Sequence, residues 1–260
     1  MARFVVALSL TLLITSFVGA QTPNPTPVKN ATALAEIEAA ITAMGGDAAA
    51  IQISDSVVTG TITPTTGSWV KPATFIWKTS GPEFRYEIQR DSGNQIFASG
   101  HGKPAVSRNG NIKPLFYHMI YGGLPFHLPM IILATKITDS TTSLTDAGTV
   151  TVLAKSAYKV QINTGTNSVD ASTTQQVWYC EATSHLPLRV EYRLPEATDM
   201  NQWTDAAAEF SDFRPVNGVL IPFTMTYYQG GVALSVLSIS TVNFNVGIDP
   251  AEFDLLGGAQ

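Results

Sequence analysis

The sequence predicts one mainly β domain, an antiparallel sheet of about ten or eleven strands with a few helices added. Apolar and polar residues alternate along most of the chain after residue 50, and short turn sequences separate the alternating stretches. No repeat of fixed period and no change of composition marks a second domain. The pattern is typical of antiparallel meanders rather than βαβ units, and these strands suffice for an open or closed barrel.

Four stretches carry the strand prediction. FRYEIQ (84–89), LRVEYRL (188–194) and VLIPFTMTYY (219–228) each place apolar side chains on one face and mostly polar ones on the other. The run VALSVLSISTVNFNV (232–246) is longer than a usual strand, and its apolar alternation slips near Val236–Leu237. The slip predicts a β-bulge and a strongly curved strand at that point.

The N-terminal end has the features of a cleaved export signal over residues 1–20. Arg3 makes the start positive, a short apolar core follows, and small residues ending at Ala20 form a cleavage site. The core is short for a membrane-spanning helix, and an uncleaved anchor is the alternative. Residues 21–29 then form a Pro-rich tether, expected to be poorly ordered, ahead of a single domain at 30–260. We expect a soluble periplasmic protein, with secretion as the alternative.

Two helical regions are predicted. Residues 30–46 form an amphipathic helix, which Asn30 or Thr32 can cap and Gly45–Gly46 ends. Its apolar stripe consists of Leu34, Ile37, Ile41 and Met44. A helix this short needs a partner surface.

The second helical region contains LPFHLPMIILA (124–134), which has a single polar side chain. Leu115–Tyr121 can form a short helix, and Pro129 suits the first turn of another. Residues 115–137 are therefore interpreted as a pair of short apolar helices. Because neither has a wide polar face, the pair either fills a core or covers the mouth of a cavity.

Composition narrows the range of partners. The chain has a formal net charge of −5, and 13% of its residues are charged, about half of the usual share of roughly 25%. With no basic stripe, this balance argues against nucleic acid and anionic lipid head groups as partners. The only cysteine, Cys180, excludes an internal disulfide framework, and it lies too far from the cleavage site to carry an N-terminal lipid.

No catalytic arrangement is evident in the sequence. G-x-S-x-G, H-E-x-x-H, P-loop and EF-hand motifs are absent. No two of the four histidines have metal-ligand spacing, so neither a metal nor a cofactor is expected. Nothing near Cys180 would lower its pKa, which predicts a buried inert thiol. The acidic residues at 199–212 are interpreted as solvated loop carboxylates rather than a glycosidase pair.

Several stretches, read in order, resemble the LolA/LolB-like family of periplasmic lipoprotein carriers. GSWVKPATFIW (67–77) resembles the family's W-V-K-R-P-x-x-F-x-W strand, and FASGHGKPAVSRNG (97–110) its S-D-G-K hairpin. LPFHLPMIILATK (124–136) resembles its T-P-F-M-L-I-A helix, and IDPAEFDL (248–255) its C-terminal ending. YCEATSHLPLRVEYRL and EFSDFRPVNGVLIPFTMTYYQGG, between residues 179 and 231, are similar to strands of many proteins of this superfamily. The likeness covers most of residues 30–254.

The resemblance implies an unclosed half-barrel with short helices as a lid over an apolar cavity that takes acyl chains. Apolar and aromatic side chains then either fill the barrel core or line this cavity. The candidates for the cavity and lid are Trp69, Lys71, Phe75, Trp77, Phe84, Tyr86, Phe116, Phe126, Met130, Ile131, Ile132, Tyr192 and Phe223. The family has Lys-Arg before the proline, and its arginine ties lid to barrel. This chain has only Lys71 there, and lysine lacks arginine's planar set of donors.

The leading hypothesis is a monomeric, non-enzymatic carrier of a lipid or acylated lipoprotein, served by membrane-bound donor and acceptor proteins. The alternative is a structural or interaction module whose barrel is filled by its own side chains, and a hydrolase comes third. Cavity volume distinguishes the first two, because roughly 300 Å³ or more of apolar space favours the carrier.

Overall fold

The computed structural model of the protein describes residues 26–66, 71–115, 127–165, 174–195 and 202–257. These residues form thirteen strands in one antiparallel sheet, in the order β6-β5-β4-β3-β2-β1-β13-β12-β11-β10-β9-β8-β7. The strands are β1 (Asp55–Pro64), β2 (Ala73–Ser80), β3 (Glu83–Arg90), β4 (Gly93–Gly100), β5 (Lys103–Arg108), β6 (Asn111–Pro114), β7 (Thr142–Val152), β8 (Lys155–Thr164), β9 (Gln176–Glu181), β10 (Pro187–Pro195), β11 (Trp203–Val216), β12 (Val219–Gln229) and β13 (Val232–Phe244).

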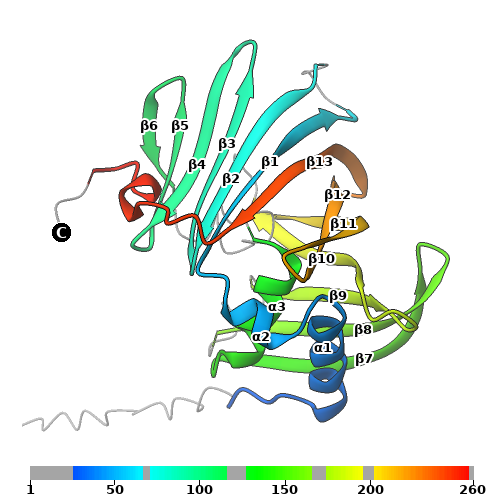
Figure 1. Ribbon diagram of the computed structural model, residues 1–260. Coiled ribbons are helices and arrows are strands. Elements are labelled where there is room, and N and C mark those ends of the chain that lie inside the picture. Colours follow the sequence, from blue (N-terminus) through cyan, green and yellow to red (C-terminus); the bar gives the residue numbers. More distant parts are fainter. Residues whose placement is uncertain (1–25, 67–70, 116–126, 166–173, 196–201, 258–260) are drawn as a thin grey trace, which may run out of the picture.

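The sheet consists of two arms that meet where β1 pairs with β13. The first arm is β1–β6, which fan out across the upper part of Figure 1, and the second arm is β7–β13, whose strands β7–β9 cross the lower part. The edge strands β6 and β7 do not pair with each other, so the sheet is not closed. The predicted half-barrel is thus confirmed.

Thirteen strands exceed the predicted ten or eleven because some strands lack the pattern that reveals them. All four residues of β6 are exposed, and most of β7 after Leu144 is exposed as well. A strand that is solvated on both faces has no apolar alternation to show in its sequence.

Three α-helices lie in the lower part of the molecule, near β7–β9 (Figure 1): α1 (Ala31–Ala43), α2 (Asp47–Ile51) and α3 (Pro129–Thr138). Asn30 caps α1, since its side chain accepts a hydrogen bond from the backbone of Ala33. Gly45 and Gly46 follow with φ of 130° and 86°, which ends the helix as predicted. The apolar stripe of α1 packs against β7, β8 and α3. Of the predicted pair of helices at 115–137, the second is α3, and the first lies outside the described residues beyond Leu115.

The last long strand is bulged, as its sequence indicated, but at other residues. Between Thr59 and Gly60 the register skips Ser240, and between Tyr227 and Tyr228 it skips Leu234. The bulges therefore flank the predicted position at Val236–Leu237. Leu234 is exposed although it is apolar, so the apolar residues alone misplace the slip.

The C-terminal segment covers the face of the first arm that points away from the hydrophobic core. The 3-10 helix η3 (Pro250–Phe253) packs on β3 and β4, and the side chain of Phe253 is fully buried. Arg85 donates to the backbone oxygen of Glu252 (2.8 Å), and Lys78 forms an ion pair with the Glu252 carboxylate. This packing fixes the C-terminal end to the sheet.

The end of the predicted tether is ordered. Lys29 forms a parallel bridge to Leu144 of β7, and the backbone bonds Leu144 N to Val28 O and Asn30 N to Leu144 O are both 3.0 Å long. Residues 28–30 thus occupy part of an edge that would otherwise be unpaired. In the described part of the chain, no helix has the length and apolar character needed to cross a bilayer.

Candidate ligand-binding site

A cavity of about 1090 Å³ lies between the helices and the ends of several strands. Its wall comes from α2 and the turn after it, from α3, from the β2–β3 and β4–β5 turns with their flanking residues, and from β8 and the start of β9. The strands belong to both arms of the sheet. The cavity thus exists because the open sheet brings its two arms to the same helices.

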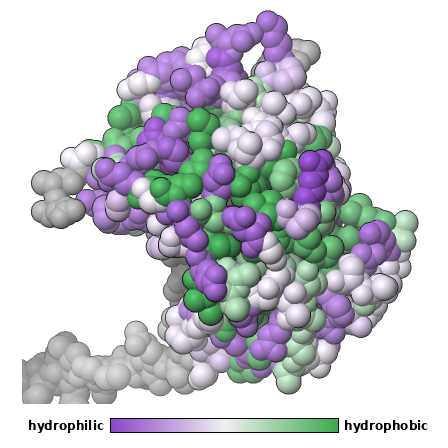
Figure 2. Space-filling model, in the orientation of Figure 1, coloured by the Kyte–Doolittle hydropathy of each residue, from purple (hydrophilic) through white to green (hydrophobic). Residues whose placement is uncertain are grey.

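The larger part of this wall is apolar. The apolar side chains on it are Ala50, Ile51, Ile53, Phe84, Ile131, Ile132, Ala134 and Ile137. Ile51 is 82% exposed, so the cavity reaches the molecular surface there. Figure 2 shows hydrophobic residues gathered in the middle of this face of the molecule and hydrophilic ones along its upper border.

Helix α3 separates the cavity from the core. Met130 and Leu133 are fully buried in the hydrophobic core, whereas Ile131 and Ala134 are only partly buried and line the cavity. Met130 and Leu133, three positions apart, share one side of the helix, and Ile131 and Ala134 share the next. Both cavity residues also pack against the core cluster, so they mark its border. The apolar residues on all sides of α3 therefore have two roles: some pack in the core and others line the cavity.

One end of α3 brings a cation to the cavity wall. Lys136 Nζ donates to Thr164 Oγ1 of β8 at 2.7 Å. Burial lowers the pKa of Lys136, and the nearby carboxylate of Asp139 offsets part of this effect. Burial would raise the pKa of Asp139, but hydrogen bonds from Thr141 and Thr142, with Lys136, hold it below its ordinary value.

Another part of the wall carries histidines and a glutamate. Glu83 Oε1 accepts a hydrogen bond from the backbone of His101 (3.1 Å), and its distance to the His101 ring nitrogen is 3.7 Å. His127 Nε2 lies 3.1 Å from the carbonyl oxygen of Gly81, and the His127 ring meets Phe84 edge-on. These contacts hold the turns together.

Three of the predicted site residues, Phe84, Ile131 and Ile132, line the cavity. Six others lie in the hydrophobic core, away from it: Phe75, Trp77, Tyr86, Met130, Tyr192 and Phe223. Lys71 is exposed and pairs with Asp91 at 3.0 Å. Trp69, Phe116 and Phe126 lie outside the described residues. An aromatic residue on an alternating strand points inward whether it packs in the core or lines a cavity. The alternation in the sequence therefore does not separate core residues from cavity residues.

Lys136 and Thr164 are residues of the wall that sequence reasoning missed. A signal for Lys136 was present, since it is the only charged residue in PMIILATKIT. Thr164 offered none, because a threonine at the end of a strand is common and its partner lies 28 residues away in the chain.

Three solved structures share the architecture over most of the chain. A DUF1329 family protein from Desulfovibrio piger has 13% sequence identity and a TM-score of 0.55, over 86% of this chain and 97% of its own. A putative outer membrane lipoprotein-sorting protein domain from Vibrio parahaemolyticus has 10% identity and a TM-score of 0.56, over 86% and 96%. A LolA superfamily protein from Nitrosomonas europaea has 10% identity and a TM-score of 0.56, over 85% of this chain and 97% of its own.

The chain has the LolA superfamily fold. The predicted resemblance is thus confirmed at the level of three-dimensional structure. No family model and no curated protein sequence matches the chain. At identities of 10–13% the likeness lies in the fold alone.

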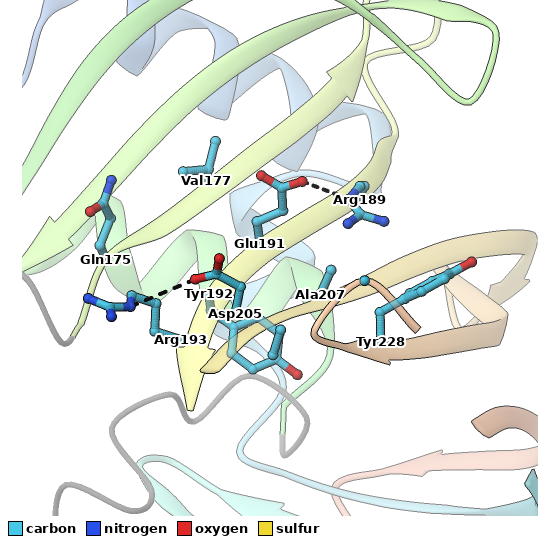
Figure 3. A pocket seen from close by; sticks show the side chains of 11 residues that line it. Gln175, Val177, Arg189, Glu191, Tyr192, Arg193, Asp205, Ala207 and Tyr228 are labelled. Atoms are coloured by element: carbon cyan, nitrogen blue, oxygen red, sulfur yellow. Dashed lines mark hydrogen bonds and ion pairs between the residues drawn. The ribbon is translucent and has the colours of Figure 1, made fainter. Parts of the chain in front are cut away.

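A second depression, of about 420 Å³, lies on the face of the LolA-type sheet that points away from the core (Figure 3). Arg189 on β10 binds Glu209 (2.6 Å) and Glu191 (3.0 Å), and its guanidinium lies over the ring of Tyr228. Tyr228 and Tyr179 donate to the two glutamates, at 2.7 and 2.8 Å. The charged groups at its centre therefore bind one another, and Arg193 and Asp205, which also line the depression, lie 3.8 Å apart.

The described residues of the LolA-type domain contain no cluster of histidine, cysteine and acidic side chains that could hold a metal ion. Cys180 is completely buried in the core, and burial, with the negative charge of Glu36, raises its pKa to about 12. A thiol with so high a pKa has almost no thiolate at neutral pH, so it is a poor nucleophile. The buried inert thiol predicted from the sequence matches this environment.

Proposed function

We propose that the protein is a non-enzymatic carrier that binds the acyl chain of a lipid or lipoprotein in the cavity beside α3. The observation that carries the proposal is the apolar wall of a cavity of about 1090 Å³ in a LolA-type sheet. Ligand pockets span roughly 300–1,000 Å³, so this space is large enough for a lipid chain. The likeness to a putative lipoprotein-sorting domain supports the same class of function.

The energetics suit reversible binding. Each buried methylene contributes about 0.8 kcal/mol, so ten of them give roughly 8 kcal/mol before the cost of ordering the chain. That cost leaves an affinity in the micromolar range or weaker, which allows a carrier to release its cargo. On this proposal the protein works in the periplasm, after cleavage of residues 1–20, between a membrane-bound donor and an acceptor.

A structural or interaction module is the second candidate, because six predicted pocket residues pack in the core. A module of this kind needs no space beside α3. The volume of the cavity therefore favours the carrier.

Displacement of a fluorescent fatty acid from the purified protein tests the proposal. Saturable binding of one probe per chain, displaced by unlabelled lipid, is the expected result. Native mass spectrometry of protein purified from its own membranes should then show lipid adducts. A wild-type protein that is folded and binds no probe would refute the carrier and favour the module.

A further inference from the structure

The wall of the apolar cavity contains one lysine or arginine among its described residues, and that residue is Lys136. Its ammonium group has three donors, of which the structure uses one, for the hydroxyl of Thr164. No ion pair with a carboxylate is formed by Lys136 in the described part of the chain. The group is thus a partly buried cation bound to a neutral hydroxyl.

The nearest acid is already engaged elsewhere. Asp139 Oδ1 accepts hydrogen bonds from the backbone and the hydroxyl of Thr141, at 2.7 and 2.8 Å, and Oδ2 accepts from Thr142 at 3.3 Å. These bonds hold the carboxylate at the turn after α3 and away from direct contact with the ammonium. Asp139 attracts Lys136 through space, and it does not saturate its donors.

A partly buried cation without a direct counter-ion loses part of its hydration, and one hydrogen bond to a hydroxyl replaces only some of it. The lowered pKa of Lys136 is a consequence of this environment. An anionic group brought by a ligand would restore the missing partner. Ile131, Ile132 and Ala134, on the same helix, continue the cavity wall from Lys136 as apolar surface.

We propose that the cavity selects an acyl chain with an anionic head group, a carboxylate or a phosphate, and that Lys136 binds this head group. The proposal rests on the proposed function, and it adds the chemical class of the ligand. It differs from the expectation from net charge, which argues against anionic lipid head groups as partners. Net charge describes the outer surface as a whole. A single lysine on a cavity wall acts locally, where partial burial weakens the screening of its charge by water.

Three ligands with the same sixteen-carbon chain test the inference: hexadecanoic acid, hexadecanol and hexadecanoyl lysophosphatidic acid. Each is titrated against an uncharged fluorescent probe bound to the full-length mature protein. We expect the wild type to bind the acid and the phosphate at least about tenfold tighter than the alcohol, as hydrogen bonds to charged groups contribute this much. The tighter of the two anions identifies the head group.

Lys136→Met keeps most of the length of the side chain and removes its charge. We expect it to lose most of the preference for the anions while binding hexadecanol within about twofold of wild type, and Lys136→Arg to keep the preference. Lys159→Met is the matched control, because Lys159 lies over the ring of Tyr179 on the other face of the sheet. It should behave as wild type.

Equal binding of acid and alcohol by the wild type would overturn the inference and leave the carrier function standing. The same conclusion would follow if Lys136→Met weakened all three ligands equally, which indicates a structural role. If none of the three binds to wild type, the carrier function fails, and the inference fails with it. If Lys136→Met does not fold, the wild-type comparison still decides whether the cavity prefers anions, and Lys136→Gln takes its place as the test of the lysine.

Discussion

Replacing Ala134 with tryptophan should fill the cavity without removing any buried atom. Ala134 is partly buried, lines the cavity and lies at the border between the cavity and the core, against which it also packs. The indole ring would occupy space that the acyl chain needs. Because the net charge is unchanged, Lys136 keeps its environment, so the variant isolates the effect of volume.

The expected loss of affinity follows from the displaced methylenes. If the ring excludes four of them, the chain loses about 3.2 kcal/mol at 0.8 kcal/mol each, which corresponds to more than a hundredfold weaker binding. The melting temperature should stay within a few degrees of wild type, since tryptophan costs an α-helix only about 0.5 kcal/mol relative to alanine. Ala35→Trp, at an exposed position of α1, is the control and should leave binding unchanged.

The assay is titration of a fluorescent fatty acid, with thermal unfolding followed by circular dichroism on the same samples. Unchanged probe binding by a folded Ala134→Trp protein would refute the reasoning, because the chain would then bind somewhere else. A large drop in melting temperature would show instead that the space beside Ala134 is filled in solution.

Four further results are expected. Gly60→Ala should destabilise the protein by at least about 2 kcal/mol in urea unfolding, because the new Cβ would collide with the carbonyl oxygen of Ser238. The control is Thr61→Ala, at an exposed position of the same strand, which should cost less than about 0.5 kcal/mol. Equal losses of stability in the two variants would contradict the collision. Cys180 should resist alkylation at pH 8 until the protein is unfolded, and rapid labelling of the native state would exclude a buried thiol. Since burial raises its pKa from 9.0 to about 12, the folded state keeps a proton that the unfolded state loses, so stability should fall as pH rises through this window, by about 1.4 kcal/mol per pH unit. Mass spectrometry of the exported protein should give Gln21 as the first residue, and recovery of the uncut chain in membranes would contradict the signal peptide.

Local patterns in the sequence were sufficient for the elements themselves. The cap at Asn30, the end of α1 at two glycines and the start of α3 at Pro129 all follow from short-range chemistry, and the structure has each of them. Inward and outward faces of β3, β10 and β12 likewise follow from alternation, because neighbouring residues on a strand point to opposite sides.

The candidate site could be predicted only in part. Phe84, Ile131 and Ile132 were expected at a cavity and lie on its wall, whereas six further candidates pack in the core. Hydrophobicity alone indicates that a side chain avoids water. It does not say whether the neighbour is another side chain or an open space, since that depends on how distant elements pack.

The sequence by itself determined a single β domain, its main strands and its apolar helix, because these depend on residues within a few positions of one another. Only the tertiary structure decided that β1 pairs with β13, nearly 180 residues away, and that the sheet stays open. The same packing placed Lys136 of α3 against Thr164 of β8 in an apolar wall. Contacts of this kind leave no local pattern, since each partner would look the same in a chain where the two never met.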